Sequence, residues 1–147
     1  SLKSGTTWTQ GIVRQLIFQG QAAPDRGAVS PWLEARWHPI DEVIEQLEAQ
    51  QHRRFIKTHL SLDGLPFFPQ VNYIVVGRDA RDVFMSLWNH HANFTPTFLT
   101  FMNKFPGRVG EPLPPCPADI HTFWREWITK GWFPWERGAS QIWGLSW

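Results

Sequence analysis

Hydrophobic residues recur three or four positions apart in four stretches of the 147-residue chain. This spacing places them on one face of an α-helix and predicts four amphipathic helices. The expected spans are 6–19, 40–51, 78–91 and 120–130, with Gly131 as the stop of the last one. Ser4 and Thr6 are available to cap the start of the first helix.

Two other stretches have the pattern of β-strands. The segment RRFIKTH at 53–59 is short and β-branched or aromatic at its centre, and a loop at 60–70 follows it. The segment NYIVVG at 72–77 is a nearly continuous apolar run, as expected of a strand covered on both faces in a parallel sheet. Because a helical pattern follows immediately, strand and helix form half of a βαβ unit. The sequence therefore predicts an α/β fold.

Long connections rich in glycine and proline separate these elements, at 19–32 and 105–119. The length fits a single domain over residues 1–147. Ten tryptophans and eleven phenylalanines are many for this length. They indicate either a core built from large rings or a pocket for an apolar small molecule.

Charge and cysteine content limit the kinds of partner. Lysine and arginine total 14 against 13 acidic residues, so no overall basic field points to nucleic acid or an anionic membrane. The longest strongly apolar run, YIVV, is far shorter than the ~20 residues of a membrane span. Cys116 is the only cysteine and favours a reducing, cytoplasmic setting.

The segment LKSGTTW at 2–8 has the composition of an anion-binding loop. A glycine among small hydroxyl residues at a helix start lets backbone N–H groups approach an anion, and the helix dipole favours negative charge there. Lys3 adds a full positive charge. An ordinary capped helix start explains the same residues equally well. The segment lacks the lysine that follows glycine in a Walker nucleotide loop, so a standard ATP site is disfavoured.

Two further segments carry candidate chemistry. In IKTH, Lys57 and His59 are two residues apart on the expected strand and leave the same face at its carboxyl end. Histidine can act as a general base near neutral pH, although a surface histidine is the alternative. In GRDARDVFMS, Arg78 can hold a phosphate with paired N–H groups, and Ser86 lies two turns further on. Surface pairing of the arginines with neighbouring aspartates is the competing interpretation.

Together these segments closely resemble the cytosolic sulfotransferase family. LKSGTTW is similar to the family's 5′-phosphosulfate loop, IKTH to its catalytic strand end, and YIVVGRDARDVFMSLW to its 3′-phosphate segment. SPWLE and the tail GWFPWERGASQIWGLSW also resemble family members, in the same order. The resemblance implies a three-layer, P-loop-like fold with a parallel sheet flanked by helices. It also implies sulfuryl transfer from 3′-phosphoadenosine-5′-phosphosulfate (PAPS) to a hydroxyl or amine of a small acceptor, without a metal.

The resemblance assigns roles residue by residue. Lys3, Ser4, Gly5, Thr6 and Thr7 would hold the phosphosulfate, with Trp8 stacking on adenine. Lys57 would assist at the transferred group and His59 would take the acceptor's proton. Arg78 and Ser86 would hold the 3′-phosphate. His90 and His91 are adjacent on a helix and diverge, which argues against a metal site there.

Two family features do not occur in this sequence: the strand that leads into the phosphate loop, and a later basic segment of the form R-K-G-x-x-G-D-W. We therefore expect a partial domain, incomplete at both ends, that is poorly stable alone and has little activity. A catalytically inactive nucleotide-binding relative and a P-loop phosphotransferase are the alternatives.

Overall fold

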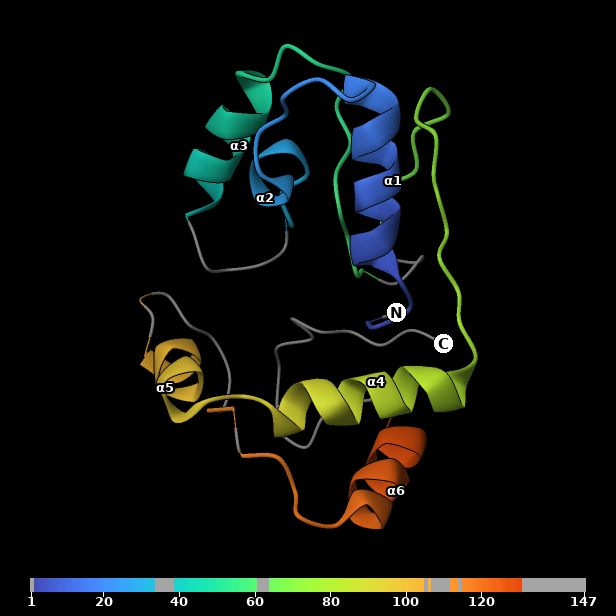
Figure 1. Cartoon of the computed structure of the whole chain (residues 1–147), viewed down its shortest axis with the longest axis vertical. Coiled ribbons are helices and arrows are strands. Elements are labelled where there is room, and N and C mark those ends of the chain that lie inside the picture. Colours follow the sequence, from blue (N-terminus) through green and yellow to red (C-terminus); the bar gives the residue numbers. More distant parts are fainter. Residues whose placement is uncertain are drawn as a thin grey trace. The chain divides into compact units, whose positions relative to one another are not determined.

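The computed structural model describes residues 2–33, 39–60, 64–104, 106, 112–113 and 115–130. Six helices lie in this part of the chain (Figure 1): α1 (Thr6–Phe18), α2 (Arg26–Val29), α3 (Ile40–Glu48), α4 (Ala80–Ala92), α5 (Pro96–Lys104) and α6 (Ile120–Lys130). The chain divides into two compact units. One consists of Ser1–Ser4 with His59–Trp147, and the other of Gly5–Thr58.

Helix α1 confirms the prediction of a helix at 6–19, but its surroundings differ from the expectation. Its N-cap residue is Gly5, which makes no side-chain hydrogen bond, rather than Ser4 or Thr6. The expected inward apolar face is largely exposed, with Leu16 at 70%. The buried residue is Gln10, whose amide donates to the backbone oxygen and the hydroxyl of Ser30 at 3.0 and 2.9 Å.

The unit Gly5–Thr58 also contains helices α2 and α3. Helix α3 buries Val43 and Leu47, one turn apart, as its apolar spacing predicts. It ends at Glu48, three residues before the expected end near Gln51. Helix α2 is a single turn inside a segment expected to be only a connection, and it packs against α1.

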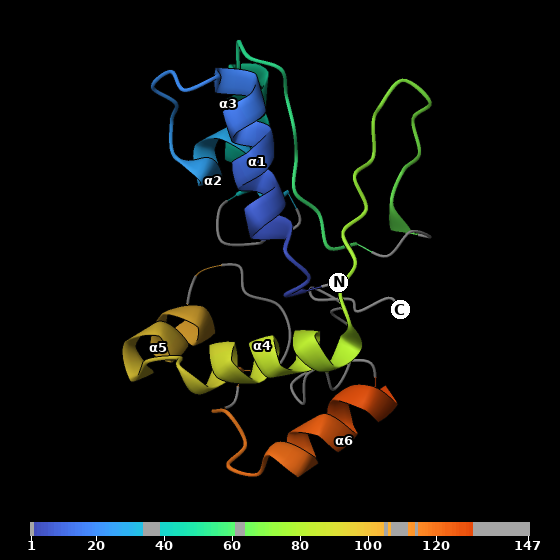
Figure 2. The same cartoon turned by 45° about the vertical axis from the view of Figure 1, so that its right-hand side comes forward.

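The larger unit has its core between α4 and α6, which cross in contact with each other (Figure 2). Val83, Phe84 and Leu87 of α4 are buried, as expected for the amphipathic helix predicted at 78–91. Phe123 and Trp127 of α6 are 1% and 2% exposed.

Three of the seven buried residues of this core are aromatic, and so are four of the seven partly buried residues packed against it. The ring of Phe84 lies 5.6 Å from Phe123, 4.8 Å from Trp124 and 5.6 Å from Trp127, centroid to centroid. Trp88 lies 5.6 Å from Phe123. Within the described residues, the prediction of a core built from large rings is confirmed. Ile128, on the same helix as Phe123, is 50% exposed.

Helix α5 is not among the predicted elements, although its start carries a recognisable signal. Thr95 accepts a hydrogen bond from the N–H of Phe98 at 3.1 Å, and proline occupies the first helical position. Near its end, the Asn103 amide donates to the Leu113 carbonyl at 2.9 Å and accepts from the Leu113 N–H at 2.6 Å. This reciprocal pair fixes Leu113, which is buried in the core, beside α5.

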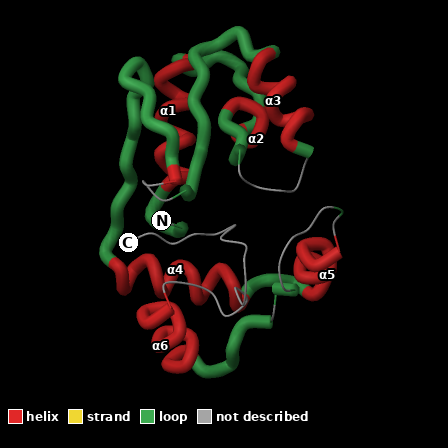
Figure 3. Tube along the Cα trace, turned by 180° about the vertical axis from the view of Figure 1, so that it is seen from behind, coloured by secondary structure: helices red, strands yellow, loops and turns green. Residues whose placement is uncertain are grey.

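The described trace contains helices and loops but no strand (Figure 3). The prediction of a strand at 72–77 covered on both faces is therefore wrong for this structure, where Val75 is 90% exposed. A parallel strand exists only when neighbouring strands satisfy its backbone groups. Here Tyr73 instead closes a loop: its hydroxyl accepts from the Phe68 N–H and donates to the Pro66 carbonyl, both at 2.9 Å.

The segment 53–59 also lacks a continuous strand. Its one described β-bridge pairs Lys57 with Trp32 in parallel, and the Lys57 N–H donates to the Pro31 carbonyl at 3.3 Å. The parallel direction agrees with the predicted sheet, but the pairing does not extend along the segment. Within the described residues, no helix is long and apolar enough to cross a membrane.

Candidate functional site

The loop before α1 has an unusual backbone. Lys3 has a φ of 60° and Gly5 a φ of 112°, so both residues are in left-handed conformations. Such a conformation is strained for lysine and suits glycine. Backbone N–H groups of residues in alternating conformations of this kind can converge on an anion. The loop therefore has a backbone suited to phosphate or sulfonate.

The start of α1 adds the positive end of a helix dipole. The first turn carries no acidic side chain and Gly5 supplies no side-chain acceptor, so no carboxylate of this turn offsets the charge. Thr7 and Trp8 are exposed, and Trp8 is 78% accessible. The exposed indole is available for stacking against a flat ring.

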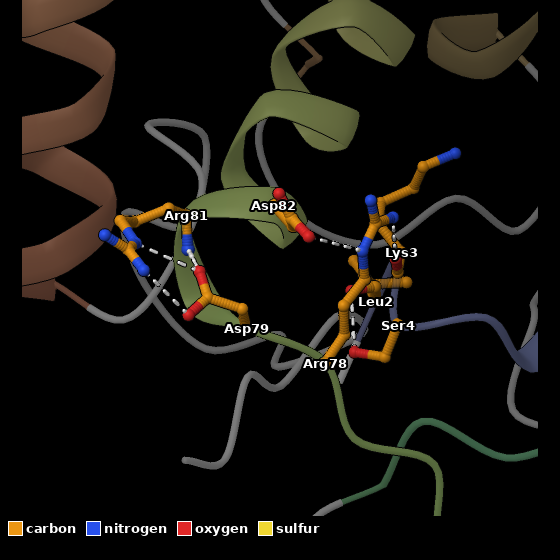
Figure 4. A network of polar contacts seen from close by, with 7 residues as sticks. All are labelled: Leu2, Lys3, Ser4, Arg78, Asp79, Arg81 and Asp82. Atoms are coloured by element: carbon orange, nitrogen blue, oxygen red, sulfur yellow. Dashed lines mark hydrogen bonds and ion pairs between the residues drawn. The ribbon is translucent and has the colours of Figure 1, made fainter.

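The segment Leu2–Ser4 lies beside the start of α4 (Figure 4). Leu2 packs against the aromatic core, and the Ser4 hydroxyl donates to the Leu2 carbonyl at 3.5 Å. The Arg78 guanidinium donates to the Lys3 carbonyl, also at 3.5 Å. Two predicted anion-binding segments, 75 residues apart in the sequence, therefore meet in one unit.

The arginines also pair with aspartates, as the competing interpretation expects. Arg78 Nε lies 3.7 Å from a carboxylate oxygen of Asp82, with both side chains partly exposed. Arg81 Nε lies 3.1 Å from Asp79, which also caps α4 by accepting from the Arg81 N–H. The hydrogen bond from Arg81 lowers the pKa of Asp79. Figure 4 shows the two pairs on opposite sides of the start of α4, with Arg78 on the side of Lys3.

Lys57 and His59 have different surroundings. The Lys57 ammonium lies 4.5 Å from the centre of the Trp32 ring, a cation–π contact inside the unit Gly5–Thr58. His59 belongs to the other unit and is 7% exposed. Lys57 and His59, which are predicted to act together, thus belong to different units.

Helix α4 carries a polar series that sequence reasoning did not recognise. Asp82, Ser86 and His90 recur every four residues on this helix, and Arg78 lies four residues before Asp82, while His91 is 2% exposed in the core. The divergence of His90 and His91 is as predicted.

The described residues contain no group of three or more histidine, cysteine or acidic side chains arranged to hold a metal. Of the predicted site residues, the larger unit includes Lys3, Ser4, His59, Arg78 and Ser86. Gly5, Thr6, Thr7, Trp8 and Lys57 belong to the other unit. The predicted resemblance of the tail at 131–147 lies outside the described residues.

Comparison with known proteins identifies the family. Residues 2–133 match the sulfotransferase domain, which is most of the chain. The chain belongs to the sulfotransferase family, and this confirms the resemblance drawn from its motifs. The family has a P-loop-like fold.

Named relatives agree with this assignment. A glycolipid sulfotransferase of Mycobacterium bovis (strain BCG / Pasteur 1173P2) is 45% identical over 116 residues, which cover 78% of this chain and 36% of that protein. Sulfotransferase 1A1 of Rattus norvegicus is 35% identical over 116 residues, covering 70% of this chain and 40% of the relative. Sulfotransferase 1E1 of Homo sapiens is 29% identical over 152 residues, covering 94% and 47%. The chain therefore spans less than half of these relatives' length. No solved structure matches it significantly.

Proposed function

We propose that this chain carries the donor-binding and catalytic residues of a sulfotransferase that moves a sulfuryl group from PAPS to a hydroxyl or amine of a small acceptor. The observation that carries the proposal is the contact between the Arg78 guanidinium and the Lys3 carbonyl. It joins the loop that resembles a 5′-phosphosulfate site to the helix start that resembles a 3′-phosphate site. A donor with phosphate groups at both ends fits such a pair of sites.

Residues 3–7 are proposed to hold the phosphosulfate. The left-handed conformations of Lys3 and Gly5 and the uncapped start of α1 favour an anion at this loop. The Lys3 ammonium would neutralise charge on the leaving phosphate, as electrostatic catalysis requires. The exposed Trp8 would stack on adenine.

Arg78 and Ser86 are proposed to bind the 3′-phosphate. The guanidinium is partly exposed and pairs with Asp82 at 3.7 Å, which is longer than a charge-assisted hydrogen bond. A phosphate can therefore replace the carboxylate as its partner. Ser86 lies two turns further along α4 and would add a hydroxyl donor.

The proposed reaction forms a bond between sulfur and the acceptor's hydroxyl oxygen or amine nitrogen, and it breaks the bond between sulfur and the oxygen of the 5′-phosphate. His59 would take the acceptor's proton as general base, and Lys57 would stabilise charge at the transferred group. 3′-phosphoadenosine-5′-phosphate (PAP) and the sulfated acceptor leave. In-line transfer through a loose transition state depends mainly on positioning and charge, by analogy with phosphoryl transfer, so no metal is assigned.

The proposed acceptor is small and largely apolar, and aromatic residues would line its pocket. The name of the mycobacterial relative adds glycolipids as an acceptor class to be tested. We also propose the three-layer arrangement, with a parallel sheet flanked by helices, to which 53–59 contributes a strand. The parallel bridge of Lys57 to Trp32 supports this strand. We further propose a cytoplasmic location for the protein, which the presence of a single cysteine in the chain supports.

Calorimetric titration with PAP, compared with ATP and magnesium, tests the donor site. We expect PAP to bind in preference to ATP. Arg78→Ala should weaken PAP binding about 10-fold to 100-fold, since it removes a charge-assisted hydrogen bond of about 1.5–3 kcal/mol. Arg81→Ala is the matched control, because Arg81 pairs with Asp79 on the other side of the helix start; its affinity should stay near that of the wild type.

Magnesium-dependent binding of ATP in preference to PAP would overturn the proposal and favour a phosphotransferase. The base assignment is tested separately with His59→Gln, chosen because His59 is buried and glutamine retains hydrogen-bonding groups. We expect this variant to bind PAP normally and to lose any transfer of sulfuryl to a phenolic or glycolipid acceptor. Unchanged turnover would remove His59 from the mechanism.

A further inference from the structure

We propose that Trp32 is a positioning residue for Lys57: its indole ring holds the lysine ammonium where that charge meets the sulfuryl group of the donor. This inference rests on the role proposed above for Lys57 at the transferred group. It gives a role to the tryptophan of SPWLE, at 30–34, a segment whose residues take no part in the reaction proposed above. Trp32 acts through the lysine and does not react itself.

Backbone pairing places the two residues side by side. Trp32 and Lys57 form a parallel β-bridge, and the Lys57 N–H donates to the Pro31 carbonyl at 3.3 Å. Bridged residues lie on neighbouring stretches of chain about 4.8 Å apart, and their side chains leave the same face. The contact between the ring and the ammonium therefore follows from the path of the main chain.

The two side chains lie at the distance of a cation–π interaction. Lys57 Nζ is 4.5 Å from the centre of the Trp32 ring, inside the roughly 6 Å over which a ring face attracts a cation. Both residues are half-buried, so water weakens this attraction only in part. The ring therefore restricts an ammonium that otherwise moves freely on its four-carbon stem.

The Trp32 segment is itself anchored to helix α1. The Gln10 amide of this helix donates to the carbonyl and the hydroxyl of Ser30, at 3.0 and 2.9 Å. Gln10, Ser30 and the neighbouring Val29 are buried, and leaving such polar groups unpaired is costly. Because α1 begins at the proposed phosphosulfate loop, these bonds tie the segment that carries Trp32 to the same helix, within one compact unit.

An ammonium fixed in advance suits sulfuryl transfer. The sulfuryl group carries negative charge, and a positive charge already in position needs no reorganisation at the moment of reaction. An ammonium has three N–H donors, so its contact with a ring face is compatible with donation to an anion. Trp32 should therefore strengthen the binding of PAPS and have little influence on PAP, which lacks the sulfuryl group.

Calorimetric titration of the full chain with PAPS and with PAP tests this expectation. Trp32→Leu should weaken PAPS binding about 2-fold to 30-fold, the range that a cation–π contact supplies, and leave PAP affinity near that of the wild type. Trp32→Phe should recover part of the PAPS affinity, because a phenyl ring keeps a π face. Leu33→Ala is the matched control, since it changes the next side chain and keeps the ring; both affinities should stay near wild type.

A double-mutant cycle separates action through Lys57 from a direct contact between Trp32 and the donor. In a Lys57→Gln background, Trp32→Leu should change PAPS affinity little, since the charge that the ring positions is already absent. An equal loss of affinity in both backgrounds would mean that Trp32 acts independently of Lys57, and it would overturn the inference.

NMR spectroscopy of the unliganded chain checks the contact itself. Protons that lie over the face of an aromatic ring resonate upfield of their ordinary position. The Cε protons of Lys57 should therefore be displaced upfield of those of the exposed Lys104, and Trp32→Leu should abolish the displacement. Signals of Lys57 and Lys104 at the same position in the wild type would also overturn the inference.

The outcomes separate this inference from the function on which it rests. If PAPS and PAP both bind and Trp32→Leu weakens neither, or weakens both equally, the positioning role is wrong and the donor site stands. If neither ligand binds to the wild type, the donor site and the positioning role are both wrong.

Discussion

Two glycines six residues apart should respond in opposite directions to the same substitution. Gly5 has a φ of 112° and a ψ of 11°, a conformation that costs an L-residue about 1–2 kcal/mol. Gly11 is inside α1, and a Cβ added to it would meet nothing within 4 Å. Replacing a helical glycine by alanine stabilises by about 0.5–1 kcal/mol. Gly5→Ala and Gly11→Ala should therefore differ by roughly 1.5–3 kcal/mol in free energy of unfolding.

Urea unfolding followed by far-ultraviolet circular dichroism measures this difference. At equal m-values, Gly5→Ala should unfold at a lower urea midpoint than the wild type and Gly11→Ala at a higher one. An unchanged or higher midpoint for Gly5→Ala would contradict the left-handed conformation at the start of α1. A lower midpoint for Gly11→Ala would contradict the open surroundings of that position.

Two other predictions concern the larger unit. Phe123→Ala removes a ring that is 1% exposed and should lower the free energy of unfolding by about 3–5 kcal/mol, whereas Phe101→Ala, 54% exposed, should have a much smaller effect in the same thermal unfolding assay. Equal effects would mean that the α4–α6 core does not form. Asp119 caps α6 by accepting from the His121 and Thr122 N–H groups, and the Thr122 hydroxyl is the main cause that lowers the pKa of Asp119. The ionised Asp119 cap should contribute fully to the free energy of unfolding above the pKa of about 3.9 that aspartate has in the unfolded chain. This contribution should be lost as the pH falls through the lower pKa of the folded protein. Asp119→Asn should keep the cap and lose this acid sensitivity, measured as stability against pH; the same acid sensitivity in both proteins would contradict the assignment.

The sequence predicted the helices better than it predicted their surroundings. Helix α4 formed as expected, with Val83 and Leu87 inward, because a four-residue apolar spacing reports on a face that any neighbouring layer can cover. The burial of Gln10 was not predictable, since its partner Ser30 is twenty residues away. Leu16 is exposed for the same reason: the pattern identifies an apolar face but does not supply its cover.

Strands were predicted least well, because their hydrogen bonds lie outside the segment itself. The apolar run that contains Val75 was sufficient to suggest a strand, but pairing requires a neighbour that a local pattern cannot provide. The candidate site was likewise only partly predictable from local sequence. Motif order alone indicated Lys3 and Arg78, whereas their contact required the structure.

The reciprocal hydrogen bonds between Asn103 and Leu113 also make the chain between them a favourable place for protein engineering. Because the pair joins the two ends of this stretch, residues added inside it do not need to disturb α5 or the core. A short peptide tag or fluorophore site inserted between Asn103 and Leu113, with both residues kept, therefore makes a reporter whose two ends are held together by these hydrogen bonds.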